Sequence, residues 1–212
     1  MISEKETTAI KVKQNYCSKC GICWSVCPFE AISLDRDKGE VGINTEKCQV
    51  CGICASACPS SAIQIAYYNY ESLIGYVKEQ AEALRTGTLA LMCRGSGSPL
   101  CGILDTLKEQ GEEKFAFLRL PCVGRLSLEF YLKAISIGID KIIIVQCDED
   151  SCRYKKGGVI NIRKVQALRA LLKYFGYEDD ILRIVKNPSK ALYETEKCVG
   201  CDKCVFICPF DA

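Results

Sequence analysis

The order of apolar and polar positions divides the chain into two patterns. Between residues 71 and 185, short apolar runs alternate with longer segments in which apolar residues recur at helical spacing. The pattern predicts helices at residues 71–85, 100–110, 126–136 and 159–175, and strands at residues 89–92, 115–120, 141–146 and 181–185. Because strands alternate with helices, we expect an α/β domain with a parallel sheet and right-handed crossovers.

A second pattern fills residues 16–66, where one arrangement of residues occurs twice, 31 positions apart. Each copy is followed by a short apolar segment, at residues 31–34 and 62–65. Between the copies, residues 33–44 contain Asp37-Lys38-Gly39 flanked by short apolar stretches, which predicts a hairpin. We therefore expect an α+β domain of two similar halves in front of the α/β domain.

The composition excludes several classes of protein. Of the 212 residues 49% are apolar, and the formal net charge of +2 argues against a nucleic-acid-binding surface. Asp140 and Lys141 interrupt the longest apolar stretch, so no membrane span is expected, and the charged residues 4–6 do not fit a signal peptide. The sequence predicts a soluble, cytoplasmic protein.

Cysteine usage points to metal binding. The chain has 17 cysteines and no histidine. An odd count, repeated spacings and the expected reducing compartment all argue against a disulfide framework. Without histidine, no imidazole can serve as a metal ligand or a general base, which weakens any catalytic hypothesis.

Twelve of the cysteines form three copies of the run Cys-x-x-Cys-x-x-Cys-x-x-x-Cys-Pro. This run is typical of bacterial ferredoxins that bind [4Fe-4S] clusters, so its presence predicts electron transfer. The copies are Cys17, Cys20, Cys23 and Cys27 before Pro28; Cys48, Cys51, Cys54 and Cys58 before Pro59; and Cys198, Cys201, Cys204 and Cys208 before Pro209.

In two-cluster ferredoxins, the first three cysteines of a run bind one cluster and the fourth binds the other. We therefore expect two ligand sets in the N-terminal domain. They are Cys17, Cys20, Cys23 with Cys58, and Cys48, Cys51, Cys54 with Cys27. Gly21 and Gly52 are expected to let the backbone approach the clusters closely. A zinc site would not need the third and fourth cysteines at these spacings.

The third run has no companion run in this sequence. By the same rule, its first three cysteines need a fourth ligand, and a further [4Fe-4S] cluster is expected there. The ligand would come from a continuation beyond Ala212, from a second protein of a complex, or from Cys101. We favour a continuation, because residues 209–212 closely repeat residues 28–31.

Four other cysteines follow predicted strands of the α/β domain. Cys93 follows strand 89–92, Cys122 follows strand 115–120, and Cys147 and Cys152 follow strand 141–146, while Cys101 lies near the start of the next predicted helix. Sites in open α/β sheets gather at the carboxyl ends of strands, so we expect these four to converge. Four thiolates without histidine suit a [2Fe-2S] cluster, or less well zinc.

The segments around these cysteines resemble a known family. Residues 121–125, Pro-Cys-Val-Gly-Arg, and residues 146–158, which carry Cys147, Cys152, Tyr154 and a Gly-Gly pair, are similar to the delta subunit of methyl-viologen-reducing hydrogenase. The resemblance implies that Cys122, Cys147 and Cys152 are ligands of a [2Fe-2S] cluster that passes electrons to a heterodisulfide reductase flavoprotein.

The chain also departs from that family. Asp148 and Arg153 stand where the family usually has histidine, and Cys93 and Cys101 are eight residues apart where the family has Cys-x-x-Cys. The fourth ligand is therefore open, and the position of Cys93 at a strand end favours it over Cys101. Arg125 is equally compatible with a place near the cluster and with exposure to solvent. Four basic residues of the long helix at residues 159–175 are expected on its solvated face, with a docking surface as the alternative: Arg163, Lys164, Arg169 and Lys173.

These observations predict three parts: a two-cluster ferredoxin domain at residues 1–70, a [2Fe-2S] α/β domain at 71–190, and the first half of a further ferredoxin-like domain at 191–212. The predicted function is a non-catalytic electron-transfer subunit. The resemblance implies a heterodisulfide-reductase-type flavoprotein as one partner and a hydrogenase, formate dehydrogenase or other low-potential enzyme as the other. Two alternatives remain: a disulfide reductase that uses Cys147 and Cys152, and a structural zinc or redox-sensing domain.

Overall fold

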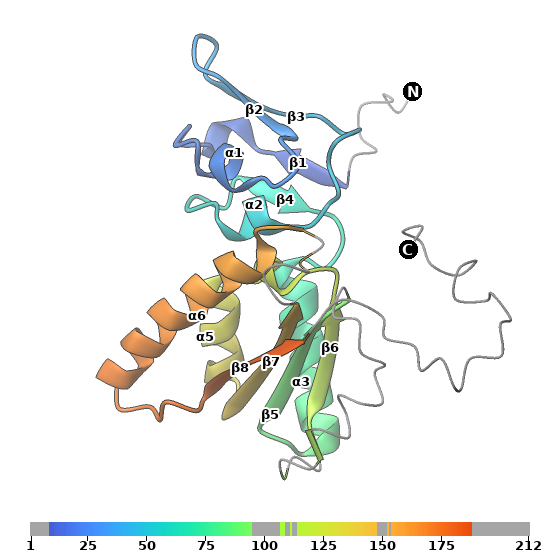
Figure 1. The fold of residues 1–212 in the computed structure, drawn as a ribbon, viewed down its shortest axis with the longest axis vertical. Helices are drawn as coiled ribbons and strands as arrows, with labels where there is room; N and C mark the ends of the chain where they lie inside the picture. The colour runs from blue at the N-terminus through green and yellow to red at the C-terminus, as the bar shows by residue number, and fades with distance from the viewer. Residues whose placement is uncertain are drawn as a thin grey trace, which may run out of the picture.

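The structure is a computed structural model, and it describes residues 9–94, 107–108, 111, 114–147, 152 and 154–187. Two parts are stacked along the long axis of the molecule (Figure 1). We call residues 9–66 the N-terminal part and residues 67–187 the middle part. Four features of the sequence lie outside the described residues: most of the helix expected at 100–110, Cys101, the pair Asp148 and Arg153, and the third cysteine run.

The N-terminal part consists of two small antiparallel sheets and two short helices. Its elements are β1 (Ile10–Val12), η2 (Gln14–Tyr16), α1 (Ile22–Val26), β2 (Ile32–Asp35), β3 (Glu40–Ile43), α2 (Ile53–Ser56) and β4 (Ile63–Ile65). β1 pairs with β4, and β2 pairs with β3. Buried side chains of Ile10, Ile32, Val41 and Ile63 form a core shared by both sheets. The two halves expected from the repeat are thus joined by one core.

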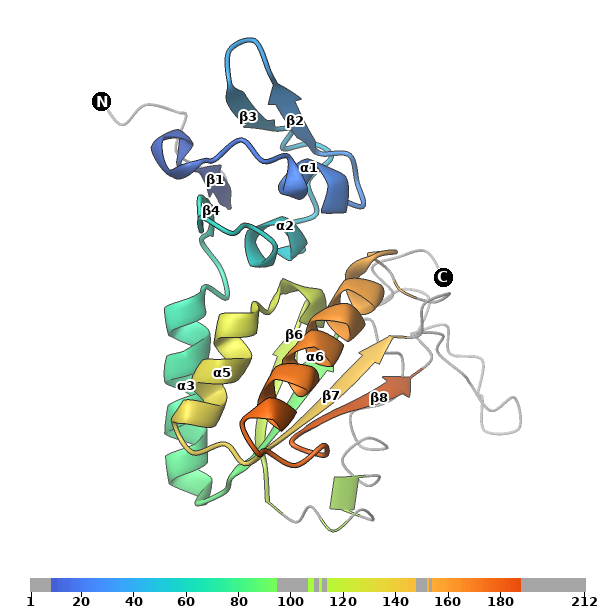
Figure 2. The ribbon, with the colours of Figure 1, turned by 90° about the vertical axis from the view of Figure 1, so that its left-hand side faces the viewer.

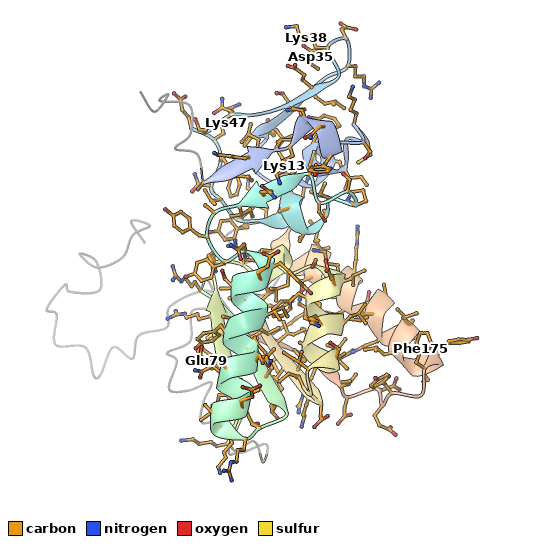
Figure 3. All side chains as sticks on the ribbon, turned by 180° about the vertical axis from the view of Figure 1, so that it is seen from behind. Lys13, Asp35, Lys38, Lys47, Glu79 and Phe175 are labelled. Atoms are coloured by element: carbon orange, nitrogen blue, oxygen red, sulfur yellow. The ribbon has the colours of Figure 1, made fainter. Side chains whose placement is uncertain are left out.

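The predicted hairpin is present. Ile32 pairs with Ile43, and Asp35 pairs with Glu40 at the end of the ladder. The Asp35 carboxylate accepts hydrogen bonds from the backbone amides of Asp37 and Lys38, at 3.1 and 3.0 Å, which closes the turn. Figure 3 shows Asp35 and Lys38 at the tip of the hairpin, the point of the N-terminal part farthest from the middle part.

The middle part is a four-stranded sheet with all strands parallel, in the order β6-β5-β7-β8. Its elements are α3 (Tyr70–Leu84), β5 (Thr88–Cys93), β6 (Ala116–Leu120), η3 (Val123–Arg125), α5 (Leu128–Ser136), β7 (Lys141–Cys147), α6 (Gly157–Tyr174) and β8 (Leu182–Asn187). The parallel α/β fold predicted from the alternating pattern is confirmed.

Helices α3, α5 and α6 cover one face of this sheet (Figure 2). Leu89 and Leu91 of β5 and Ile142 and Ile144 of β7 point to that face, while Ala90, Met92, Ile143 and Val145 point to the other. Alternate residues of the central strands are therefore buried on both sides, as expected for a parallel sheet. Within the described ranges, no helix is both long enough and apolar enough to span a lipid bilayer.

Candidate metal centres

The eight described cysteines of the N-terminal part surround two cavities. One is lined by Cys17, Cys20, Cys23 and Cys58, and the other by Cys27, Cys48, Cys51 and Cys54. Each cavity therefore combines three cysteines of one run with the fourth cysteine of the other. This is the grouping that the ferredoxin spacing predicts, and the role of these thiols as ligands stays a prediction.

The backbone brings the cysteines around each cavity in the same way in both halves. α1 and α2 begin directly after Gly21 and Gly52, whose φ angles of +76° and +84° favour glycine. After each helix, the sulfur of the fourth cysteine accepts a hydrogen bond from a backbone amide: Cys27 from Ala31 at 3.4 Å and Cys58 from Ala62 at 3.3 Å. Such amide donors stabilise thiolates.

The cavity walls are otherwise mainly apolar and include Ile10 and Ile32 at one site and Val12 and Ile63 at the other, with Gln49 lining the first and Ser18 and Ser60 the second. Sulfur donors in an apolar shell with amide hydrogen bonds are the surroundings that iron-sulfur clusters use. The donor set therefore fits such clusters.

The protonation of these thiols depends on burial. Burial raises the pKa of Cys23 and Cys51, and that of Cys54 to about 12. For Cys58, burial raises the pKa, but hydrogen bonds from the Ser60 hydroxyl and from backbone amides lower it by a larger amount. The net shift of the pKa is therefore downward. The thiols of Cys23, Cys51 and Cys54 therefore hold their protons more tightly than a free thiol, and a bound metal would have to displace these protons.

Four cysteines of the middle part meet at the carboxyl ends of the strands. Cys93 ends β5, Cys122 follows β6, Cys147 ends β7, and Cys152 lies in the following loop. Their thiols form a chain of contacts in which Cys122 meets Cys93, Cys93 meets Cys147, and Cys147 meets Cys152. The backbone amide of Val123 also donates to the sulfur of Cys93 at 3.2 Å. The structure thus brings the four strand-end cysteines together.

The pKa values of three of these thiols are raised, those of Cys93, Cys147 and Cys152. The hydrogen bond with Cys122 raises the pKa of Cys93 to about 12. The contact with Cys152 lowers the pKa of Cys147, but its contact with Cys93 and its burial raise it more, to about 12. The contact with Cys147 raises the pKa of Cys152. In the part of the chain that the structure describes, no three cysteine or acidic side chains gather tightly enough to hold a single metal ion.

Three glycines allow the chain to close around Cys122. A Cβ atom on Gly157 would lie 2.5 Å from the Cys122 sulfur, and one on Gly124 would lie 2.7 Å from the carbonyl oxygen of Gly157. A Cβ on Gly158 would lie 3.4 Å from the Cys147 carbonyl oxygen. These glycines belong to the Cys-x-Gly-Arg and Gly-Gly segments singled out in the sequence. Their absent side chains let η3 and the start of α6 pack against the cysteines.

The two parts share a buried junction. Cys51 and Ile53 of the N-terminal part form a common core with Cys122 and Tyr154 of the middle part. The rings of Phe29 and Tyr154 also meet edge to face, with their centroids 5.8 Å apart. A candidate cysteine from each part therefore lies in the same small core.

Two cations lie at this junction, and the structure corrects the expectation for one of them and decides between two alternatives for the other. The expectation that Lys164 lies on a solvated helix face is wrong, because it is half-buried and donates to Ser56 across the junction. Arg125, for which the sequence left burial and exposure open, is only 8% exposed. The sequence marks Arg125 only by its place after Cys-x-Gly. This signal does not show that the N-terminal part covers the side chain.

Models of known protein families match three stretches of the chain. The family model described as "Methyl-viologen-reducing hydrogenase, delta subunit" matches residues 88–199. The "4Fe-4S dicluster domain" model matches residues 16–62, and the "4Fe-4S binding domain" model matches residues 191–212. The chain thus contains 4Fe-4S binding domains on both sides of the hydrogenase-type domain.

Curated relatives resemble different portions of the chain. An iron-sulfur subunit of the F420-non-reducing hydrogenase from Archaeoglobus profundus is 34% identical over 32% of this chain and 49% of its own length. The corresponding vhu iron-sulfur subunit from Methanopyrus kandleri is 27% identical over 45% of this chain and 73% of its own length. One subunit of the CoB-CoM heterodisulfide reductase from Methanosarcina acetivorans is 28% identical over 85% of this chain. The chain spans 23% of that last protein.

Proposed function

The chain belongs to the family of methyl-viologen-reducing hydrogenase delta subunits, and from this premise we propose that it is an iron-sulfur subunit that carries electrons within a hydrogenase- or heterodisulfide-reductase-type complex. The observation that carries the proposal is the shared core of Cys51 and Cys122. It brings a cysteine from each of two candidate sites to one junction, which supports the proposal that electrons pass from one site to the other.

The proposed cofactors follow from the donor sets. The two cavities of the N-terminal part would each hold a [4Fe-4S] cluster, and the four strand-end cysteines would hold a [2Fe-2S] cluster, with Cys101 as the alternative to Cys93. The third run, from Cys198 to Cys208, would hold a further [4Fe-4S] cluster. When bound, these groups supply reversible one-electron chemistry.

Three cysteines of the middle part would hold its group away from water. Cys93, Cys122 and Cys147 are each at most 4% exposed, so their surroundings are largely dry. Amide donors to Cys27, Cys58 and Cys93 would stabilise the thiolates and raise the potential of the bound group. No group with the position of a general acid or base is needed for this role.

We propose the partners and the domain limits on the same basis. Related proteins are subunits of hydrogenase and heterodisulfide reductase complexes, which supports membership of a redox complex. A heterodisulfide-reductase-type flavoprotein and a hydrogenase, formate dehydrogenase or other low-potential enzyme are the proposed partners. The proposed domains are residues 1–70, 71–190 and 191–212.

The experiment is a metal analysis of the whole chain, prepared anaerobically, with EPR spectra of the reduced protein. Cys147→Ser should remove the middle cluster, its iron and its EPR signal while the ferredoxin signals remain. Cys101→Ser is the matched comparison and should keep the middle signal if Cys93 is the fourth ligand. Zinc in place of iron in the middle site, or equal spectra for wild type and Cys147→Ser, would contradict the proposal.

The disulfide reductase alternative has less support. A reactive dithiol needs at least one thiolate at neutral pH, and such thiols have lowered pKa values. The pKa values of Cys147 and Cys152 are instead raised. Rapid alkylation of these two thiols in the protein as isolated would reverse this preference.

A further inference from the structure

Arg125 is buried where the N-terminal and middle parts meet. It follows Cys122 by three residues, ends η3, and is 8% exposed. A Cβ atom on Gly52 would lie 2.7 Å from the Cβ and 3.2 Å from the Nε of Arg125. The side chain therefore runs along the loop that carries Cys51 and Cys54.

The polar contacts of Arg125 do not neutralise its charge. Its Nη2 donates to the carbonyl oxygen of Tyr67 at 2.7 Å and, more weakly, to that of Tyr68 at 3.5 Å. The guanidinium also lies over the ring of Tyr68, 5.2 Å from the centroid. Among the described residues, no carboxylate forms an ion pair with it. An arginine stays ionised in proteins, and a buried charge without a counter-ion is costly.

Cysteine sulfurs from both parts lie near Arg125 and become negative when they bind a metal. Burial lowers the pKa of Arg125, whereas the thiolates of Cys51 and Cys122 favour its charged form and raise the pKa. Cys51 lines the second cavity of the N-terminal part, and Cys122 belongs to the middle set. When both sites are loaded, each would contain four thiolates, and Arg125 lies near one cysteine of each site.

We propose that Arg125 is a counter-ion shared by the second ferredoxin site and the middle site, and that its charge raises the reduction potential of both. This inference rests on the proposed function, because it assumes redox-active groups at these sites. Reduction adds negative charge, which a fixed cation in a poorly solvated place stabilises more than water would. Arg125 therefore sets the reduction potentials of the two sites through its charge.

The first ferredoxin site lacks this arrangement. Its equivalent glycine, Gly21, is open: a Cβ there would meet only the Leu34 side chain, at 3.6 Å. Ile22, the equivalent of the fully buried Ile53, is 40% exposed. Lys19 and Arg36 line a surface hollow beside Gly21 and are exposed, so water screens their charges. In the described part of the chain, only the second of the two duplicated halves thus has a buried cation beside its site. Removing the charge of Arg125 should therefore change the reduction potential of the second ferredoxin site more than that of the first.

The test is an EPR-monitored redox titration of each centre in the whole, cluster-loaded chain. Arg125→Gln should lower the potential of the second ferredoxin site and of the middle site, with a smaller shift at the first ferredoxin site. Arg125→Lys keeps the charge and should stay closer to wild type. Arg36→Gln, which removes an exposed cation beside the first site, is the matched control and should leave the other two potentials unchanged.

A second pair of variants keeps the packing of Arg125 against Gly52. Tyr68→Glu would place a carboxylate beside the guanidinium and should lower the same two potentials, while Tyr68→Gln should not. Unchanged potentials in Arg125→Gln and Tyr68→Glu, with only a loss of thermal stability, would overturn the inference and leave a structural role. If the middle site holds no redox centre, the proposed function fails there, and the shift at the second ferredoxin site still tests Arg125.

Discussion

The ammonium group of Lys164 donates to the hydroxyl oxygen of Ser56 at 2.6 Å, across the junction between the middle and N-terminal parts. The same group donates to the carbonyl oxygens of Gly124 and Leu126, each at 3.0 Å. One lysine of α6 thus connects α2 of the N-terminal part with the middle of the η3 turn and with the residue that follows it. Burial lowers the pKa of Lys164 to about 8, although the nearby Cys122 acts in the opposite direction.

This lowered pKa predicts a dependence of stability on pH. The unfolded chain keeps Lys164 protonated up to about pH 10.5, whereas the folded chain releases the proton near pH 8. Between these values the unfolded state binds more protons, so the contribution of Lys164 to stability should rise with pH, and it should be lost as pH falls through 8. Thermal unfolding of wild type and Lys164→Met, followed by circular dichroism from pH 7 to 10, measures this difference.

Lys173, which is exposed and pairs with Asp179 at 3.3 Å, provides the control. Lys173→Met should follow the wild-type pH profile. Parallel profiles for wild type and Lys164→Met would mean that Lys164 titrates normally in the folded protein.

The close approach of Gly52 to Arg125 predicts different effects of alanine in the two halves. Both Gly21→Ala and Gly52→Ala force alanine into a left-handed conformation, which costs about 1–2 kcal/mol. Gly52→Ala also places its methyl group 2.7 Å from Arg125 and 3.1 Å from Ile65, and overpacking of this kind costs about 1–3 kcal/mol more. Denaturant unfolding of both variants should show the larger loss for Gly52→Ala. Equal losses of unfolding free energy would mean that the junction accommodates the added methyl group without destabilisation.

The contact between Gly157 and the Cys122 sulfur predicts a defect in the middle site. A methyl group on Gly157 would lie 2.5 Å from that sulfur, so Gly157→Ala should displace Cys122 and reduce the iron content of the cluster proposed for the middle site. Gly75→Ala is the control, because the added methyl group in α3 would meet no atom within 4 Å outside its chain neighbours and the nearby backbone of its own helix. The control should gain about 0.5–1 kcal/mol of stability and keep its iron. Full iron content in Gly157→Ala would contradict this prediction.

A buried polar chain behind the cysteines gives a prediction on stability alone. The Tyr131 hydroxyl donates to the Asn161 side chain at 2.8 Å, and Asn161 donates to Gln146 at 2.9 Å. All three residues are fully buried, so Tyr131→Phe leaves an acceptor of Asn161 without its donor and should cost about 1–3 kcal/mol. Chemical denaturation measures the loss, with the exposed Tyr174→Phe as reference. If both variants unfold alike, the hydrogen bond contributes nothing to stability.

Much of the fold follows from local pattern. Residues 142–145 are β-branched throughout, and they form the buried centre of β7 because short runs of this kind favour strands in parallel sheets. The cysteines after the strands meet because all four strands point the same way, which the alternation of strands and helices already implies. The helix ends differ from the prediction by one or two residues, since α3 begins at Tyr70 and α5 at Leu128.

The junction was not predictable in the same way. Lys164 and Ser56 are 108 positions apart, and no local spacing relates them. A lysine in a helix is usually solvated, and an arginine after a turn is equally compatible with either surroundings. Their burial is decided by the surface that the N-terminal part presents, which includes the missing side chain of Gly52 and the hydroxyl of Ser56.

The turn from Cys122 to Arg125 has two roles, and these limit which ferredoxin domains could replace the N-terminal part. The turn supplies a cysteine to the middle set, and it also forms the surface against which α2 rests. A foreign ferredoxin module exchanged for residues 9–66 would fit only if it had no side chain at the position of Gly52 and a small hydroxyl residue at that of Ser56. The N-terminal part could thus be exchanged only for a domain whose surface matches the turn of the middle part.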